Sequence, residues 1–297
     1  MISIIIITYN HEQFIQQAIE GILSQKVNTT IEIIIGEDFS TDKTREICEN
    51  YKKKYPSLIN LLPSNKNLGM TDNFIRSYNA CRGKYIAICE GDDYWIEPYK
   101  LQKQLDILEK HKDCTAVFHN SAIVENNTII GSVYKESILN ITIKDLFRGK
   151  YMKTNTIMFR NKGIISPEIV IDDTTLGLFL LDDGSYAHYI DETMSAYRIH
   201  EGGIESKVSA KKSFYLNLKT NILVEKIYYK KYPDWVNDSS LVFFTDFSIR
   251  LLSQKYIGLA LKCFIRSFKY RSTLKSRSTY LYTFFKQILK IIIKLKP

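Results

Sequence analysis

The feature that most constrains the fold of this chain is the regular alternation of short apolar runs with helical stretches over its first 120 residues. The β-rich runs and the helical stretches after them cover residues 2–8, 12–25, 31–36, 42–55, 57–63, 71–83, 84–90 and 97–111. The first run is apolar almost throughout, which is typical of a strand buried on both faces. This repetition predicts a doubly wound, mostly parallel α/β sheet with right-handed crossovers.

The rest of the chain is less regular. A helix ended by glycine is predicted for residues 172–184, and two further strands for residues 185–191 and 194–200. After these strands the composition changes to long helical stretches rich in Lys, Tyr and Phe. We therefore expect two domains: an α/β domain over residues 1–205 and a helical, basic region over residues 206–297.

Charge is divided unevenly between these two regions. Residues 206–297 hold 19 Lys and Arg against 4 Asp and Glu, whereas the preceding residues hold 22 against 28, so the net charges are +15 and −6. The net charge of +9 for the whole chain would fit a nucleic-acid-binding protein, but an acidic first domain argues against contact with phosphate backbones. We expect no nucleic-acid partner.

Cysteine usage and hydropathy indicate the compartment. The five cysteines are scattered and form no Cys-x-x-Cys pair, which favours buried thiols in a reducing cytosol over zinc sites or disulfides. No uncharged apolar run reaches 18 residues, and the start "MISIIIITYN" lacks the basic leader of a signal peptide. We expect a cytoplasmic protein.

Polar loops follow the predicted strands at one edge of the sheet. Ligands of parallel sheets bind outside the carboxyl ends of the strands, so the loops at residues 8–12, 37–40, 65–69 and 90–95 should converge. The last loop, "EGDDYW", places three acids directly after an apolar run. Either the three carboxylates hold a cation, or they form a solvated acidic turn that caps the helix beginning near Glu97.

Five stretches of sequence, in order, carry a resemblance to a known family. They are "IIIITYN", "EDFSTDKT", "NLG", "GKYIAICEGDDYWIEPYKLQKQ" and "IDETMSAYRIHEGG". Over residues 1–205 the chain resembles the family 2 glycosyltransferases, inverting enzymes with the GT-A fold, and residues 206–297 show no such match. The resemblance implies a Rossmann-like sheet with a nucleotide-sugar half at about residues 1–120 and an acceptor half at about residues 121–205.

A nucleotide-sugar donor carries a diphosphate, whose negative charge requires a cation. The resemblance assigns this role to manganese or magnesium held by the acidic loop, with Asp92 and Asp93 as the favoured ligands. Glu90 stands where the family motif has its first aspartate, and it would contact the ribose or support the ligands. The histidine that matches His200 approaches the metal and the diphosphate in the family, which makes His200 a further candidate ligand. Arg198, on the same side of that strand, is a candidate contact of donor or acceptor.

The resemblance also implies a nucleotide site. Asp38 matches the aspartate of the family that accepts a hydrogen bond from the base, which is compatible with a uridine donor. Asp92 would contact the nucleotide as well as the metal. The remaining nucleotide-binding candidates are Thr8, Tyr9 and Asn10 as the floor of the site, Glu12 beside them, and Asn67 after the third strand.

An inverting transfer needs a base that removes the proton of the acceptor hydroxyl. Asp173 lies where the family places this base, at the head of a helix, and its neighbour Asp172 is either the alternative base, a contact of the substrates or the cap of the helix. Tyr94 and Trp95 are further candidates for contacts with donor or acceptor, although a buried anchor is the favoured interpretation for Trp95.

The basic region ends in a pattern suited to a membrane surface. Residues 279–296 place Lys286, Lys290 and Lys294 four apart on one helical face, with apolar residues over most of the rest. The alternative is an amphipathic helix packed against the enzyme or a partner. We expect peripheral contact with the inner face of the cell membrane, where a lipid-linked acceptor would be found.

Together these features predict a metal-dependent inverting glycosyltransferase. It would act on a glycan or lipid-linked acceptor in the synthesis of a cell-surface polysaccharide such as a capsule or lipopolysaccharide. One alternative is a nucleotidyltransferase with a similar sheet, although residues 8–14 lack the glycine-rich basic loop that such enzymes use. Another is a catalytically silent nucleotide-binding or scaffolding protein. The sequence makes no prediction of oligomeric state.

Overall fold

The computed structural model describes residues 1–135, 140–166, 168–169, 172–203, 209–270 and 286. The chain divides into two compact units. The first consists of Met1–Leu146 and Tyr151–Gly203, and the second of Phe147–Lys150 and the residues from Ile204 onward. The predicted domain boundary at residue 205 falls among residues 204–208, which lie outside the described part of the chain.

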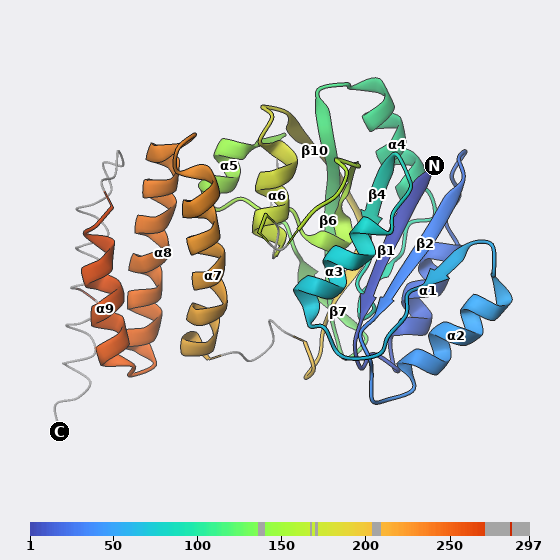
Figure 1. The fold of residues 1–297 in the computed structure, drawn as a ribbon, viewed down its shortest axis with the longest axis horizontal. Coiled ribbons are helices and arrows are strands. Elements are labelled where there is room, and N and C mark those ends of the chain that lie inside the picture. The colour runs from blue at the N-terminus through green and yellow to red at the C-terminus, as the bar shows by residue number, and fades with distance from the viewer. Residues whose placement is uncertain (136–139, 167, 170–171, 204–208, 271–285, 287–297) are drawn as a thin grey trace. The chain divides into compact units, whose positions relative to one another are not determined.

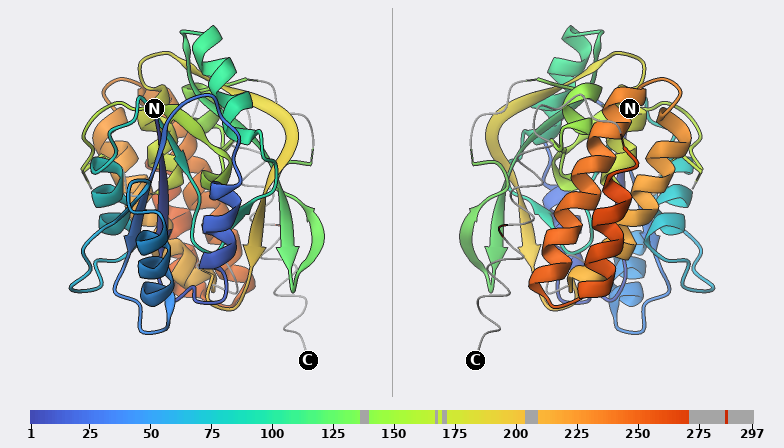
Figure 2. Two further views of the ribbon diagram at one scale, coloured as in Figure 1. Left: turned by 90° about the vertical axis from the view of Figure 1, so that its right-hand side faces the viewer. Right: turned by 90° about the vertical axis from the view of Figure 1, so that its left-hand side faces the viewer.

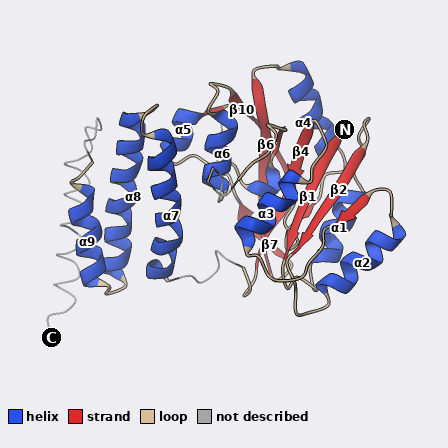
Figure 3. Ribbon diagram, in the orientation of Figure 1, coloured by secondary structure: helices blue, strands red, loops and turns tan. Residues whose placement is uncertain are grey.

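The first unit is built around one ten-stranded mixed sheet (Figures 1 and 3). Its strands are β1 Ile2–Thr8, β2 Ile31–Glu37, β3 Ile59–Leu61, β4 Tyr85–Ile88, β5 Tyr94–Trp95, β6 Cys114–Glu125, β7 Thr128–Ser132, β8 Ile141–Thr142, β9 Met158–Arg160 and β10 Tyr186–Ile199. The order across the sheet is β3-β2-β1-β4-β9-β6-β10-β5, with β7 beside β6 and β8 beside β10. The first four strands are parallel neighbours, whereas β9 lies antiparallel between β4 and β6.

Helices cover both faces of the sheet (Figure 2). The helices of the first unit are α1 Ile15–Leu23, α2 Thr44–Lys54, α3 Met70–Asn79, α4 Lys100–Lys110, α5 Ile143–Phe147, the short η1 Thr154–Thr156, and α6 Asp173–Leu181. Ile4 of β1 packs in one core cluster with Ile15 of α1, and the next residue, Ile5, is equally buried but points to the other face. A Cβ on Gly36 of β2 would lie 2.1 Å from Oγ of Ser77, so glycine is what allows α3 to approach this closely.

The elements predicted for the first domain lie within a few residues of observed ones, with one exception. Residues 185–191 and 194–200, which we expected to form two strands, belong to the single strand β10. The strand continues through the polar residues between them because its pairing with β6 shifts register at Ile190 and Thr193. Irregularities of this kind let a strand bend without ending.

The second unit is helical. Its helices α7 Ala210–Tyr228, α8 Pro233–Ser253 and α9 Ile257–Ser267 run side by side (Figures 1 and 2). Phe214, Phe244, Phe247 and Leu251 lie in the core between them. No helix within the described residues is long and apolar enough to cross a membrane. The amphipathic helix predicted for residues 279–296 lies outside the described residues, apart from Lys286.

Candidate functional site

The loops after β1, β2 and β4 meet at one edge of the sheet, as the parallel topology predicts. The backbone N–H of Asp38, directly after β2, donates to the carbonyl of Thr8 at 3.0 Å. The backbone N–H of Gly91, after β4, donates to the carbonyl of Ile7 at 2.9 Å. The residues that sequence reasoning drew from three separate loops therefore share one region of the surface.

The polar side chains after β1 join this loop to the loop after β2. Oδ1 of Asn10 accepts from the backbone N–H of Thr41 at 2.8 Å, and Oε2 of Glu12 accepts from that of Lys43 at 3.0 Å. Asn10 itself has a positive φ of 54°, which asparagine tolerates better than most residues. Asn10 and Glu12 therefore shape the floor, while the ring of Tyr9 is 43% exposed and available to stack on a base.

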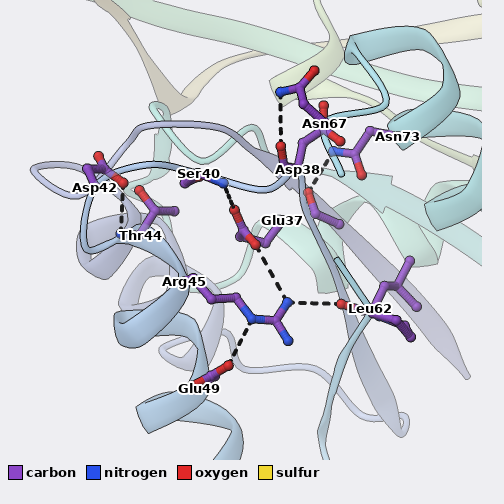
Figure 4. A network of polar contacts seen from close by, with 12 residues as sticks. Glu37, Asp38, Ser40, Asp42, Thr44, Arg45, Glu49, Leu62, Asn67 and Asn73 are labelled. Carbon is purple, nitrogen blue, oxygen red and sulfur yellow. Dashed lines mark hydrogen bonds and ion pairs between the residues drawn. The ribbon is translucent and has the colours of Figure 1, made fainter. Parts of the chain in front are cut away.

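Asp38 is buried and pins the loop that follows β3. Its two carboxylate oxygens accept from the backbone N–H groups of Leu68 and Gly69, at 2.8 and 2.9 Å. The side-chain amide of Asn67 donates to the carbonyl oxygen of Asp38 at 3.0 Å (Figure 4). Asp38 and Asn67 thus hold each other in position. Each carboxylate oxygen of Asp38 keeps a second lone pair that could accept a hydrogen bond from a nucleotide base.

A second polar network lies beside Asp38 at the end of β2. Oε1 of the buried Glu37 accepts from the backbone N–H of Ser40 at 2.6 Å (Figure 4). Its other oxygen lies 3.6 Å from a guanidinium nitrogen of Arg45, which also donates to the carbonyl of Leu62 at 3.0 Å. These contacts join the end of β2 to the loop after it, to Arg45 of α2 and to the residue that follows β3.

The three acids after β4 point in different directions. Oδ2 of Asp92 lies 3.1 Å from Nε2 of His200, which follows β10. Asp93 turns inward instead, and its Oδ1 accepts from the backbone N–H of Arg198 at 2.9 Å. Oε2 of Glu90 is buried with no hydrogen-bond partner within the described residues. The favoured metal pair is therefore split, because only Asp92 faces the histidine.

Burial and mutual repulsion shift the pKa values of these acids. Burial, followed by the charges of Asp92 and Glu90, raises the pKa of Asp93 well above its usual range. Burial and then the nearby charge of Asp173 raise the pKa of Glu90 to about 7. Burial would raise the pKa of Asp92 too, but the hydrogen bond to His200, the charge of His11 and a backbone hydrogen bond together outweigh burial, so the pKa is lowered. Of the three acids, Asp92 thus has the strongest tendency to stay ionised.

Arg198 holds the acidic loop in place from the end of β10. Its guanidinium donates to the carbonyl oxygen of Asp92 and, at 2.6 Å, to Oε1 of Gln17. The rings of Phe14 and Tyr94 lie 4.6 and 4.8 Å from its central carbon. Arg198 and Tyr94, which we expected to contact the substrates, therefore pack against each other and support the acidic loop.

The start of α6 separates the roles of the two candidate bases. Asp172 is the N-cap: its Oδ1 accepts from the backbone N–H of Thr175 at 2.9 Å, and the Thr175 hydroxyl accepts from the backbone N–H of Asp172 at 3.0 Å. Asp173 is the first residue of the helix. The helix dipole favours a negative charge there, and the pKa of Glu90 responds to that charge.

His11, Asp92 and His200 form a group that could hold a metal ion. One donor atom from each residue lies within 4.8 Å of the other two. Two imidazoles and a carboxylate are common ligands of divalent transition metals, and burial lowers the pKa of His11, which favours the neutral form that can bind a metal. The donor set therefore fits the divalent cation that the sequence predicts, with His11 in place of Asp93.

Sequence reasoning missed two residues of this region. No pattern in the sequence marks His11 as functional, although it stands three positions after the end of β1. Lys153, whose Nζ lies 4.0 Å from the centre of the Tyr197 ring, acts on the pKa values of Glu90 and Asp93. Lys153 lies in an irregular segment before η1, where no periodic pattern could have marked it.

Trp95 is an anchor and not a contact surface. Its indole N–H donates to the carbonyl of Asn155 at 3.1 Å, and its ring is buried with Nζ of Lys100 3.9 Å from the ring centre. Trp95 is therefore the buried anchor that the sequence favours.

Residues 3–165, more than half of the chain, match the family described as Glycosyl transferase family 2. The chain belongs to this family. The predicted family is thereby confirmed, and family membership argues against the nucleotidyltransferase alternative.

Three relatives illustrate how far the family likeness extends. "Uncharacterized protein Rv1520" of Mycobacterium tuberculosis is 32% identical over 207 residues, 68% of this chain and 60% of the relative. The dTDP-rhamnosyl transferase RfbG of Shigella flexneri is 30% identical over 247 residues, 75% of this chain and 80% of the relative. The Escherichia coli "UDP-Glc:alpha-D-GlcNAc-diphosphoundecaprenol beta-1,3-glucosyltransferase WfaP" is 29% identical over 228 residues, 75% and 85%. The chain therefore spans less than two thirds of the mycobacterial relative.

Two solved structures of similar shape support the fold. S. aureus TarS 1–349 in complex with UDP-GlcNAc has a TM-score of 0.60 at 15% identity, covering 90% of this chain and 89% of that one. The mannosyltransferase PcManGT from Pyrobaculum calidifontis, in complex with GDP-Man and Mn²⁺, has a TM-score of 0.57 at 12% identity, covering 97% and 84%. The expected GT-A type α/β fold, followed by a helical region, is confirmed.

Proposed function

We propose that this protein is a metal-dependent inverting glycosyltransferase. It would move a sugar from a UDP-linked donor to a glycan or lipid-linked acceptor in cell-surface polysaccharide synthesis. The proposal rests on the histidine–carboxylate group around Asp92, which lies with the buried Asp38 in adjoining loops at the carboxyl ends of parallel strands. It rests also on Asp173, whose charge acts on Glu90 of the same acidic loop. The names of RfbG and WfaP, both sugar transferases, support it.

The cation site would bind the donor diphosphate. Asp92 and His200, 3.1 Å apart, would hold the ion. When bound, a divalent cation offsets the charge that develops on the diphosphate as it departs. Arg198 would act as a positioning residue, because it fixes the main chain of Asp92 and touches no open surface of the site.

Asp173 would act as the catalytic base. As the acceptor oxygen attacks the anomeric carbon from the face opposite the leaving diphosphate, its proton passes to a carboxylate oxygen of Asp173. The bond from the anomeric carbon to the diphosphate breaks with its electron pair on the leaving oxygen. Asp172 is unsuited to this task because its side chain is engaged in capping α6.

Substitution of Asp173 tests the proposal. Asp173→Asn should retain affinity for the nucleotide sugar and lose transfer by several orders of magnitude, because only the proton acceptor is removed. Asp172→Asn should keep α6 intact, since asparagine caps helices as well as aspartate does. The matched control is Asp182→Asn at the other end of α6, which should leave turnover unchanged. Near-normal turnover in Asp173→Asn would remove this residue from the mechanism.

A uridine donor is proposed from the base site. Asp38 can accept the N–H of a uracil ring, and Tyr9 can stack on it without using charge. The names of TarS, bound to UDP-GlcNAc, and of WfaP support uridine, whereas RfbG is named for a dTDP sugar. Thermal stabilisation by UDP, dTDP and GDP sugars, each with and without Mn²⁺, would identify the donor class. Release of UDP only when an acceptor is present separates an enzyme from a silent scaffold.

Membrane contact from the cytoplasmic side is proposed for the second unit. Four apolar side chains of α9 and the turn after it are exposed: Ile257, Leu261, Ile265 and Phe268. Lys262 and Arg266 are exposed on the same helix, and the sequence contains no Asp or Glu after Asp246. Apolar and cationic side chains together suit an interface with anionic lipids. WfaP, whose name specifies a diphosphoundecaprenol acceptor, supports a lipid-linked acceptor.

Co-sedimentation with vesicles tests this contact. The full chain should sediment with phosphatidylglycerol vesicles and much less with phosphatidylcholine vesicles. Charge reversal at Lys262 and Arg266 should reduce binding more than reversal at the exposed Lys212 and Lys219 of α7. If neither reversal at α9 nor truncation after Leu274 changes sedimentation, α9 and the residues after Leu274 do not bind lipid.

A further inference from the structure

The imidazole of His11 lies at the candidate metal centre, and neither of its ring nitrogens makes a hydrogen bond within the described part of the chain. Its backbone N–H donates to Oγ1 of Thr44 at 2.8 Å, which fixes the main chain. Its ring Nδ1 is buried with no hydrogen-bond partner among the described residues. Its Nε2 lies 3.8 Å from Oδ2 of Asp92, beyond hydrogen-bond distance. The side chain of His11 is 16% exposed, and a histidine this enclosed with a purely structural role ordinarily uses its ring nitrogens in hydrogen bonds.

Packing holds this ring toward the other donors. The ring centres of His11 and His200 are 5.8 Å apart, and Phe14 packs against both, at 6.3 and 4.7 Å. A Cβ on Gly91 would lie 2.4 Å from Oγ1 of Thr8 and 3.1 Å from Nδ1 of His11. Glycine at this position therefore lets the acidic loop close against the loop that carries His11.

The two donor distances to Asp92 match the spacing of ligands around one ion, and all three donor atoms lie within 4.8 Å of one another. Ligand atoms about 2.1 Å from one ion are about 3 Å apart at a right angle and about 4 Å apart on opposite sides. Oδ2 of Asp92 lies 3.1 Å from Nε2 of His200 and 3.8 Å from Nε2 of His11. By contrast, Asp93 has its Oδ1 engaged by the backbone of Arg198 and lies outside the group.

We propose that His11 is a third protein ligand of the cation, beside Asp92 and His200, and that this set favours transition-metal ions over magnesium. The inference deepens the proposed function and rests on it for the presence of the cation. Imidazole nitrogen binds manganese, cobalt and zinc better than it binds magnesium, which prefers oxygen ligands and keeps its water. A single carboxylate also leaves a divalent ion with a net charge of +1, which attracts a diphosphate more strongly than a neutralised ion would.

Metal binding by the full chain in the absence of nucleotide tests the inference. Titration with Mn²⁺, followed through the electron paramagnetic resonance signal of the free ion, gives the affinity directly, and competition with Mg²⁺ gives the selectivity. His11→Phe preserves the ring packing and removes both nitrogens. It should raise the Kd for Mn²⁺ by at least about ten-fold and change the Kd for Mg²⁺ far less. His111→Phe, at an exposed histidine outside the group, should change neither value.

A spectroscopic measurement on the unaltered protein keeps the test independent of folding in the variant. Pulsed electron paramagnetic resonance of bound Mn²⁺ should show nitrogen coupling from two imidazoles in the wild type and from one in His11→Phe or His200→Phe. A single imidazole in the wild type, or an unchanged Mn²⁺ affinity in His11→Phe, would overturn the role of His11 and leave the proposed enzyme standing. A wild-type chain that binds no Mn²⁺ with or without UDP would overturn the metal-dependent function itself.

Discussion

Lys100, at the start of α4, provides a quantitative test of the electrostatics beneath the site. Its side chain is fully buried, with Nζ 2.8 Å from Oε1 of Gln104 and 3.9 Å from the centre of the Trp95 ring. Burial lowers the pKa of Lys100 from 10.5 to about 7, slightly opposed by Cys89. The other titratable group linked to it is His119, whose pKa is pushed well down by burial and then by Lys100.

The lowered pKa defines a pH window. Between pH 7 and 10.5 the unfolded chain holds this proton more tightly than the native chain does, so stability should rise with pH across that window. Below pH 7 both states are protonated and the destabilisation is complete. At 1.36 kcal/mol for each pKa unit, the destabilisation is about 4 kcal/mol at pH 7 and about 2 kcal/mol at pH 9.

Lys100→Met removes this proton while keeping a long apolar side chain. The substitution leaves the acceptor oxygen of Gln104 without its donor, which costs about 1–3 kcal/mol. We therefore expect Lys100→Met to be more stable than wild type at pH 7 by about 2 kcal/mol, with the advantage shrinking by about 2 kcal/mol at pH 9. Lys110→Met, at the exposed end of the same helix, should change stability by less than about 0.5 kcal/mol.

Urea unfolding measured by tryptophan fluorescence provides the assay. The chain has two tryptophans, so a Trp235→Phe background leaves Trp95 as the reporter of the first unit. Comparing Lys100→Met with its parent at each pH cancels the titration of the groups that Lys100 does not influence, which leaves only His119 and Cys89 of the described residues linked to the substitution. The prediction is wrong if the variant is less stable than its parent at pH 7, or if its advantage is the same at pH 7 and pH 9. Either result would show that the charge of Lys100 does not destabilise the native state.

Three further outcomes follow from the contacts of the site. Gly91→Ala should weaken Mn²⁺ binding by at least about ten-fold, because its Cβ would meet Thr8 at 2.4 Å, whereas Gly131→Ala has open space and should bind normally in the same titration. Asp38→Asn can no longer accept hydrogen bonds from both loop amides, so calorimetry should show weaker UDP binding. Urea unfolding should show a loss of about 1–3 kcal/mol in stability. Unchanged values in both measurements would remove Asp38 from the site. Arg198→Lys keeps the charge but loses the forked geometry, so kcat should fall with the Kd for UDP little changed, and normal kcat would argue against positioning.

The order of the elements could be predicted from the sequence because each element buries its own apolar face. The run at 2–8 and the helix after it needed only their own periodicity to be recognised, and their ends lie within three residues of prediction. The acidic loop after β4 could be placed at the ligand-binding edge for the same reason, since the parallel topology assigns that edge. The sequence by itself thus determined the fold class, the family and the neighbourhood of the site.

Tertiary structure alone decided which side chains face each other there. Glu90, Asp92 and Asp93 are near neighbours in sequence, yet only Asp92 meets His200, which is 108 residues away. His11 joins this group because of Gly91 and Phe14, and Asp172 caps α6 so that Asp173 remains at its head. The periodicity of a strand or a helix indicates which of its residues are buried. The direction of a side chain in a loop instead depends on contacts with distant segments of the chain, and these contacts form only in the folded sheet.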